Sequence, residues 1–248
     1  MGSRCKRWAM AVLALAVAGP AAALTWGQRD SFQSGTAEGW VAGLASIIPP
    51  TVVPGGGPAG AGDGYLSLVS TGGLGAGSRL TVIAGAAWTG NYGAAGVDHI
   101  TLDVKNFGST DLDLRLFLSG PPGATAVSSS AVHVPVSSGW MAVSFALDSS
   151  ALGGQALATL ADTQQLRLFH SSTAAFPGEA VVATLGLDNI TAVPEPGQAL
   201  LFAAGLLAVA ASRWRLAAPA ICSACSACSP CSACSTTPLA QAAHPTRR

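Results

Sequence analysis

Hydrophobic and polar residues alternate along much of the segment between Leu24 and Ala192. In His99–Lys105, isoleucine, leucine and valine occupy every second position, and polar residues fill the positions between them. Asp111–Leu118 repeats this pattern with four leucines. Successive side chains of a strand point to opposite faces of a sheet, so this period of two predicts strands with one buried and one polar face.

Shorter runs of the same kind predict six further strands: Tyr65–Val69, Arg79–Ile83, Val132–Val136, Trp140–Leu147, Leu166–His170 and Val181–Ile190. Glycine, proline and asparagine separate the runs, as in Gly120–Gly123. Eight or more antiparallel strands, each with one polar face, predict an all-β fold in which residues 24–192 form a two-layer antiparallel β-sandwich. The only helix that we expect in this domain is a short turn around Leu152–Asp162.

Residues 1–23 have the three parts of a secretory signal peptide. Arg4, Lys6 and Arg7 precede an apolar run that is too short to span a bilayer, and small residues follow Pro20. The pattern predicts export, with Leu24 as the first residue of the mature chain. An uncleaved N-terminal anchor is the alternative.

A second apolar run covers residues 197–211. Arg213, Trp214 and Arg215 follow it after one serine. Tryptophan and arginine are typical of the interface between membrane and water, so we predict a C-terminal transmembrane helix within residues 193–215. A buried helix is the alternative for this run.

The residues before this helix add a sorting motif. Pro194, Glu195 and Pro196, followed by an apolar helix and a basic cluster, resemble the PEP-CTERM sorting signal of exported Gram-negative proteins. The resemblance implies that an exosortase-type membrane peptidase is a partner that recognises these three residues, and that Arg213 and Arg215 stay in the cytoplasm. It also implies an inner-membrane intermediate, followed by release to the cell surface or extracellular matrix.

The chain continues beyond the basic cluster, whereas members of that family usually end there. Residues 216–248 contain five cysteines at every third position within a Cys-Ser-Ala repeat: Cys222, Cys225, Cys228, Cys231 and Cys234. A structural zinc site usually needs two cysteine pairs separated by a loop, and this repeat has no such loop. We therefore interpret the tail as low-complexity sequence; translation of an altered reading frame is the alternative.

The charged fraction of the chain and the net charge of residues 24–192 exclude two classes of protein. Only 10% of the residues are charged, which excludes the surface of an ordinary cytosolic enzyme. Between Leu24 and Ala192 the chain has five basic and eleven acidic residues, a net charge of −6. An acidic body cannot neutralise phosphates, so we expect no nucleic-acid partner.

Two segments carry a second resemblance. Ser31–Trp40 is similar to the opening strand of galactose-binding-like jelly-roll carbohydrate-binding modules, and Leu187–Ile190 is similar to their closing strand. The resemblance implies that the two segments lie side by side, and that Asp188 helps to hold a structural calcium. Gln33 stands where the family has an acid, and a neutral ligand weakens calcium binding. The alternative for Asp188 is an exposed strand end.

Sugar binding uses aromatic rings together with polar neighbours. Trp88, Asn91 and Tyr92 lie in one short loop and are the candidate glycan-binding residues, with core packing as the alternative for the two rings. We expect exopolysaccharide as a possible partner.

Catalytic motifs are missing from the sequence, which has no Gly-x-Ser-x-Gly elbow and no histidine with a partner at metal-ligand spacing. We predict a non-enzymatic envelope or matrix protein, without a cofactor other than the calcium considered above. The alternatives are a polysaccharide hydrolase that uses Asp103, Asp111 or Asp113 as acid and base, and a permanently membrane-anchored surface protein.

Overall fold

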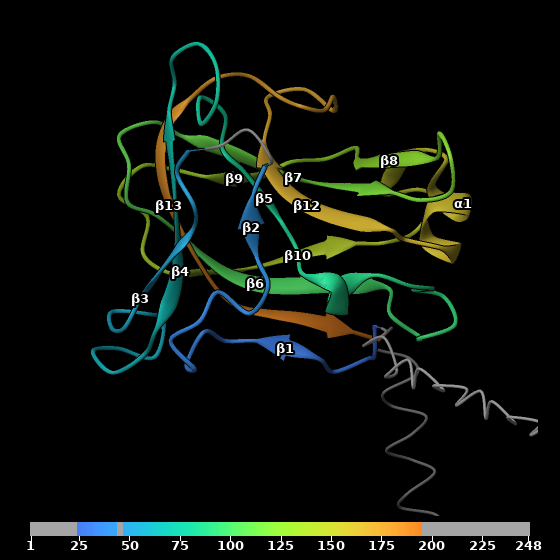
Figure 1. The fold of residues 1–248 in the computed structure, drawn as a ribbon, viewed down its shortest axis with the longest axis horizontal. Coiled ribbons are helices and arrows are strands. Elements are labelled where there is room, and N and C mark those ends of the chain that lie inside the picture. Colours follow the sequence, from blue (N-terminus) through green and yellow to red (C-terminus); the bar gives the residue numbers. More distant parts are fainter. Residues whose placement is uncertain (1–23, 44–46, 195–248) are drawn as a thin grey trace, which may run out of the picture. The chain divides into compact units, whose positions relative to one another are not determined.

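The computed structural model describes residues 24–43 and 47–194, which form two antiparallel sheets (Figure 1). The predicted signal peptide at 1–23 lies outside the described residues. So do Glu195, Pro196, the transmembrane helix with Arg213 and Arg215, and the cysteine tail. Within the described residues, no helix is long and apolar enough to cross a membrane.

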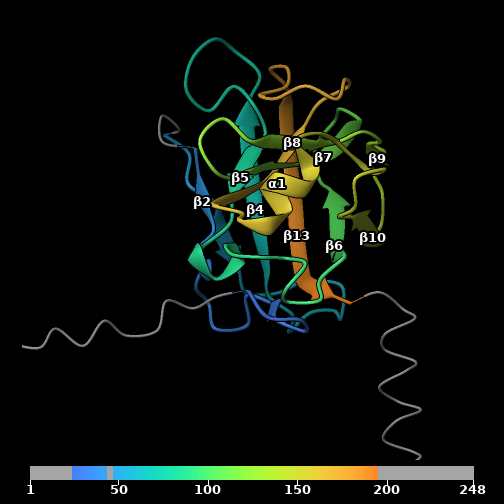
Figure 2. The same cartoon turned by 90° about the vertical axis from the view of Figure 1, so that its right-hand side faces the viewer.

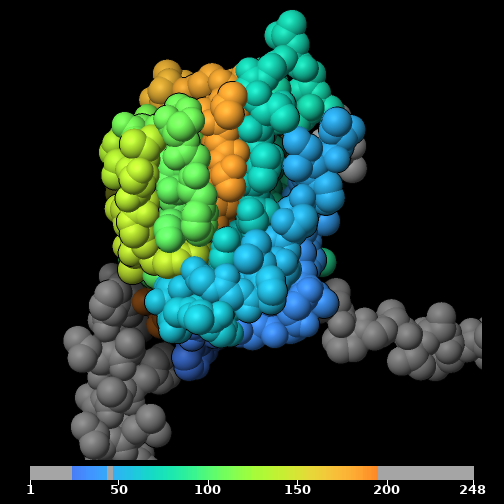
Figure 3. Space-filling view, turned by 90° about the vertical axis from the view of Figure 1, so that its left-hand side faces the viewer, coloured from blue at the N-terminus to red at the C-terminus, as the bar shows by residue number. Residues whose placement is uncertain are grey.

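Sheet A contains the strands nearest the two ends of the domain. Its order is β10 (Met141–Ala146), β6 (His99–Asn106), β13 (Val182–Val193), β4 (Tyr65–Thr71) and β3 (Thr51–Val53). The short strand β1 (Arg29–Asp30) pairs with the last part of β13. Figure 3 shows β10, β6, β13 and β4 side by side on the outer face of this sheet.

Sheet B packs against sheet A as the second layer (Figure 2). Its order is β11 (Leu152–Gly154), β8 (Thr125–Ser128), β7 (Leu112–Ser119), β12 (Gln165–His170), β5 (Thr81–Ile83) and β2 (Val41–Ala42). Strand β9 (Val132–Val134) also pairs with β7. Two helices occur in the described part of the chain, the 3₁₀ turn η1 (Ala86–Trp88) and the six-residue α1 (Ala156–Ala161).

The core follows from the alternation in sequence. In β6 every second side chain is buried, beginning with Ile100. Leucines from both sheets fill the space between the layers with almost no exposure: Leu66, Leu112, Leu114, Leu118, Leu166, Leu185 and Leu187. The prediction of an all-β fold with two antiparallel sheets is therefore confirmed.

All eight predicted strands are present, and five further strands were missed. The missed strands β1, β2, β3, β8 and β11 have two to four residues each, which is too short to show a period of two. The expected helical turn around Leu152–Asp162 is confirmed in part, because α1 fills its second half while β11 occupies its beginning.

Arg115 departs from the expected polar, solvated face of β7. It is only 6% exposed, and its guanidinium donates to the carbonyl oxygens of Ser171, Ser128 and Ser129 at 2.8–2.9 Å. Loops before β9 and after β12 cover this part of the strand, so the predicted polar face of β7 is not exposed to solvent at Arg115. Buried charges require such partners.

The second resemblance implies that Ser31–Trp40 is an opening strand beside Leu187–Ile190. This is wrong for Ser31–Trp40, which contains no strand; the pairing with β13 is made by the two residues before it. Arg29 pairs with Thr191 and Asp30 pairs with Ile190. Between Asp188 and Thr191 the register of β13 against β6 shifts, and Asn189 there has a φ of 54°. Such a bulge changes which side chains the strand presents to each face.

Candidate functional site

Trp88 and Tyr92, which the sequence suggested for sugar binding, lie in the core. Both rings have 0% exposure. The Trp88 Nε1–H donates to Asp30 Oδ2 at 2.6 Å, and the Tyr92 hydroxyl donates to the Trp88 carbonyl oxygen at 3.0 Å. Asn91 caps the loop by accepting from the Ala94 N–H at 2.7 Å. The rings offer no face to a ligand, so the expectation of an aromatic platform here is corrected to core packing.

Asp188 is fully buried rather than exposed at a strand end. Its Oδ1 accepts from the Asn189 N–H at 2.7 Å, and its Oδ2 has no hydrogen-bond partner. The pKa of this carboxyl is raised to about 6, mainly by burial and also by Asp63 and Asp103, while the Asn189 hydrogen bond and Arg29 oppose the shift. The environment thus favours the neutral form of Asp188.

The residues around Asp188 fit a calcium ion poorly. Gln33 uses its side-chain carbonyl oxygen to accept from the Gly64 N–H at 3.3 Å and donates its amide to Asp63. Asp103 accepts from the Asn189 amide at 2.6 Å. Among the described residues, no three acidic, histidine or cysteine side chains are arranged to hold a metal ion. Asp188 Oδ2 is a buried oxygen without a hydrogen-bond partner, but calcium normally takes six to eight oxygen ligands.

The three aspartates considered for hydrolysis are divided between the sheets. Asp103 lies on β6 of sheet A, whereas Asp111 and Asp113 lie at the start of β7 in sheet B. His133 Nδ1 is 3.0 Å from an Asp113 oxygen, and its Nε2 is 4.0 Å from an Asp111 oxygen. This is an exposed ion-pair cluster, and the structure does not bring Asp103 into it.

The outer face of sheet A carries a packed aromatic trio: Tyr65, Phe107 and Trp140. The Tyr65 ring lies 5.4 Å from Phe107 and 5.3 Å from Trp140, and the Trp140 Nε1–H donates to the Gly56 carbonyl oxygen at 2.9 Å. The trio closes over Gly186, where a Cβ atom would be 2.7 Å from Phe107 Cε2. These rings contact one another and the backbone, so we assign them to packing.

The outer face of sheet B presents an apolar row with one arginine in its middle. The strand registers align five outward residues across β2, β5, β12, β7 and β8: Val41, Ile83, Arg167, Phe117 and Val127. This row forms because each residue faces away from the core at the same level of its strand.

Phe176, from the loop after β12, folds onto this row. Its ring stacks on Phe117 with centroids 4.3 Å apart and meets Phe169 edge-on at 5.4 Å. The Arg167 guanidinium lies 4.9 Å from the Phe176 ring centre, and its Nε–H donates to Gln165 Oε1 at 2.6 Å. Burial lowers the pKa of Arg167, which stays charged at neutral pH.

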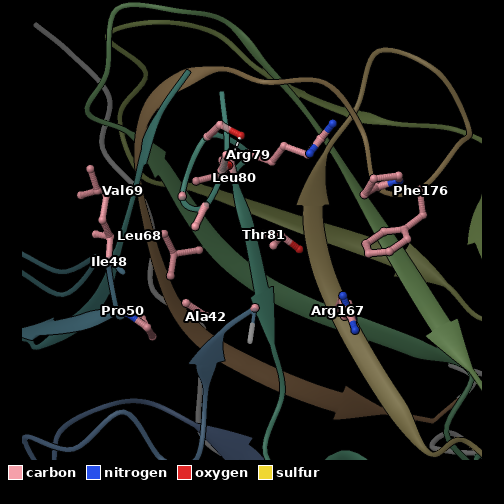
Figure 4. Close-up of a pocket in the computed structure, with 16 residues that line it drawn as sticks. Ala42, Ile48, Pro50, Leu68, Val69, Arg79, Leu80, Thr81, Arg167 and Phe176 are labelled. Atoms are coloured by element: carbon pink, nitrogen blue, oxygen red, sulfur yellow. Dashed lines mark hydrogen bonds between the residues drawn. The ribbon is translucent and has the colours of Figure 1, made fainter. Parts of the chain in front are cut away.

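A groove of about 350 Å³ opens beside these rings, at the edge where β4 and β5 meet (Figure 4). Leu68, Val69 and Ile48 form one side, and Arg79, Arg167 and Phe176 form the other (Figure 4). The Arg79 Nε–H donates to the Gly178 carbonyl oxygen at 2.8 Å, which fixes the arginine against the loop that carries Phe176. We take this groove and the adjoining apolar row as the candidate site.

Thr81 also lines the groove. It pairs with Phe169 in sheet B, and its hydroxyl is buried without a hydrogen-bond partner. Because this hydroxyl is buried, the surface that the site offers to a ligand consists of apolar and aromatic side chains and two guanidinium groups. An arrangement of this kind suits a ligand with apolar ring faces and many hydroxyls.

Sequence reasoning missed this site because its parts are far apart along the chain. Phe176 lies in a loop outside the alternating segments, and Arg79 and Arg167 lie on strands that were predicted without any binding role. The available signal was charge: only five basic residues lie between Leu24 and Ala192, and two of them line the groove, Arg167 on β12 and Arg79 just before β5.

The sequence matches no family model and no curated protein. Among solved structures, the chain is similar to an exo-beta-agarase, with a TM-score of 0.51 and 13% identity over 69% of this chain. The chain spans only about a quarter of that agarase (25%). At this identity, the likeness shows a shared fold.

Two carbohydrate-binding modules are also similar. The family 11 module from Clostridium thermocellum, solved with a mixed-linked tetrasaccharide, gives a TM-score of 0.46 and 11% identity over 68% of this chain and 96% of the module. A family 28 module specific for non-crystalline cellulose gives a TM-score of 0.43 and 12% identity over 70% of this chain and 99% of the module.

Proposed function

We propose that this chain is an exported, non-enzymatic glycan-binding protein of the cell envelope or extracellular matrix. The observation that carries the proposal is the groove beside the Phe117–Phe176 stack, where apolar surface meets the guanidinium groups of Arg79 and Arg167. Ring faces of sugars pack on aromatic and aliphatic surface, and their hydroxyls need polar partners at the edge. The sandwich shares its fold with part of an enzyme named for an activity on agar, which is in keeping with a polysaccharide ligand.

The arrangement of carboxylates supports a binding role over a hydrolytic one. A glycosidase needs two carboxyl groups about 5–10 Å apart across the bond that it cleaves. No acidic side chain lines the described groove. Asp111 and Asp113 instead lie beside His133 of β9, toward the opposite end of β7 from Phe117.

Binding and catalysis can be measured together. We would run the full chain through gels that contain agarose, mixed-linked β-glucan, xylan, polygalacturonate or κ-carrageenan, and assay the same mixtures for new reducing ends. The proposal predicts slowed migration in at least one gel without release of reducing ends. Unchanged migration in all five gels would contradict glycan binding, and release of reducing ends would support the hydrolase alternative.

The proposal includes sorting by the PEP-CTERM-like signal. Pro194, Glu195 and Pro196 follow β13 directly, so cleavage there would leave every strand of the sandwich on the released part. The exosortase-type peptidase would be the partner at the inner membrane.

Intact mass with terminal peptides tests this route, on protein recovered from the medium and from membranes. An extracellular form that begins at Leu24 and ends near Pro194 or Glu195 is expected. Protein found only in membranes, with Cys222–Arg248 still attached, would contradict sorting by cleavage and leave a permanently anchored sandwich.

A further inference from the structure

Positive charge gathers at the groove although the domain is acidic. Residues 24–192 have eleven acidic and five basic side chains, yet two of the five basic residues, Arg79 and Arg167, line the groove. No aspartate or glutamate lines it within the described residues. A local potential of sign opposite to the rest of a surface selects ligands of the matching charge.

Both arginines also lack an acidic partner. Every ion pair within 4.0 Å among the described residues involves a histidine. Arg79 donates from Nε to the Gly178 carbonyl oxygen, and Arg167 donates from Nε to Gln165 Oε1. Among the described residues, no acidic side chain therefore neutralises their positive charges.

Glu179 follows Gly178, whose carbonyl oxygen Arg79 contacts, but its carboxylate is directed away from Arg79. Its carboxylate accepts from the Ser172 N–H at 2.6 Å and from the Ser171 hydroxyl at 3.2 Å, and it lies 3.7 Å from His170 Nε2. Although burial raises its pKa, the hydrogen bonds from Ser172 and Ser171 lower it to about 2. Glu179 thus stays charged and bound within its own loop, and it does not pair with Arg79.

The guanidinium groups are held in place. The Nε contact of Arg79 fixes it to the loop, and Arg167 is fixed by Gln165 and by the ring of Phe176. In each case the bond is made by Nε, so the two terminal nitrogens remain for a ligand. That pair of nitrogens matches the two oxygens of a carboxylate or sulfate, and less mobility is lost when a fixed side chain binds.

From these observations we infer that the groove binds an acidic polysaccharide, whose carboxylate or sulfate groups pair with Arg79 and Arg167 while its sugar rings lie on the Phe117–Phe176 surface. The inference rests on the proposed glycan binding and names the chemical class of the glycan. The acidic body would repel a polyanion everywhere except at this groove.

Two matched pairs of polysaccharides test the inference on the full chain. Polygalacturonate is compared with its methyl ester, which removes the carboxylate charge, and κ-carrageenan is compared with agarose, a related galactan without sulfate. We expect at least one charged member to bind about tenfold more tightly than its neutral counterpart, with the advantage shrinking as salt is raised. The pair that responds distinguishes carboxylate from sulfate.

Variants of Arg79 test whether its guanidinium binds the acidic groups of the polysaccharide. Arg79→Gln removes one exposed guanidinium, and we expect about tenfold weaker binding of the charged member, with neutral polysaccharides unaffected. Arg79→Lys keeps the positive charge but lacks the paired N–H donors of a guanidinium, so it should recover part of the lost affinity. Lys105→Gln is the control, because it removes an equal charge from sheet A, where Lys105 lies over Phe107 at 4.6 Å. Thermal unfolding of each variant checks that the fold is intact.

The outcomes separate the two proposals. Equal or tighter binding of the neutral members, unchanged in Arg79→Gln, would overturn the acidic ligand and leave glycan binding standing. Equal losses in Arg79→Gln and Lys105→Gln would overturn the assignment to the groove. Binding of none of the polysaccharides would overturn both proposals, and equally tight binding of duplex DNA would show a general affinity for polyanions and overturn specificity for a glycan.

Discussion

The outer faces of the two sheets use aromatic residues in different ways. On sheet A, Tyr65, Phe107 and Trp140 pack on one another over Gly186. On sheet B, Phe117 and Phe176 stack beside a groove and share it with Arg79 and Arg167. The number of aromatic rings does not separate the two faces. What separates them is that the rings of sheet A close over one another and Gly186, whereas the rings of sheet B border a groove lined by two arginines, which have no acidic partner among the described residues.

The largest effect is expected on stability, when the aromatic trio on sheet A is disrupted. Trp140→Ala removes two ring contacts and the hydrogen bond to the Gly56 carbonyl oxygen. Because the ring is only partly buried, we expect the free energy of unfolding to fall by about 2–3 kcal/mol, below the usual cost for a fully buried tryptophan. Denaturant unfolding measures this loss, while polysaccharide binding by the folded variant should be unchanged. A clear loss of binding with unchanged stability would indicate that the binding site lies on sheet A.

At the groove, we expect a substitution to weaken polysaccharide binding rather than stability. Phe176→Ala removes the ring that stacks on Phe117, and we expect affinity for the bound polysaccharide to fall about tenfold, or ~1.4 kcal/mol. Titration calorimetry measures the affinity. Phe107→Ala is the matched control, since it removes a phenylalanine ring from the other face, and it should leave affinity unchanged. If both variants lost affinity equally, the difference between the faces would not hold.

A smaller effect is expected below the aromatic trio. An added Cβ at Gly186 would lie 2.7 Å from Phe107 Cε2 and 2.8 Å from Trp140 Cη2, so the rings must shift. We expect Gly186→Ala to destabilise the fold by about 1 kcal/mol, which thermal unfolding would detect. Gly73→Ala is the control, because no atom lies within 4 Å of its added Cβ. Equal melting temperatures for the two variants would mean that the trio is loosely packed.

The smallest effect concerns Asp188. Burial raises its folded-state pKa to about 6, above the ordinary value of 3.8, so the unfolded chain loses this proton first as pH rises. The contribution of Asp188 to stability is therefore fully present below about pH 4 and is lost by about pH 6. Asp188→Asn should remove this decline from a series of unfolding experiments across that range. Parallel profiles for the two proteins would contradict the assignment of the shift.

Calcium can be tested on the same two proteins. The described residues do not assemble a calcium ligand set, so we expect millimolar calcium to leave the melting temperature of the wild type unchanged at neutral pH. A rise in the wild type that is absent from Asp188→Asn would restore the calcium site implied by the resemblance.

The sequence predicted the framework of the fold better than its site. Alternation in β6 and β7 placed the leucines inward correctly, because periodicity reports burial directly. The same reasoning could not show that neighbouring loops cover Arg115 and Asp188, since that depends on contacts between distant segments. Trp88 and Tyr92 looked like an exposed pair because they flank a polar residue in a glycine-rich loop, but that loop packs into the core.

The most direct test of the account is to locate the bound glycan by hydrogen–deuterium exchange of the chain, with and without the polysaccharide that it binds most tightly. The account predicts slower exchange in residues 79–83, 165–170 and 171–180, which surround the groove, and no change in β6 and β10 of sheet A. Protection confined to β6, β10 and the segment around Trp140 would contradict it.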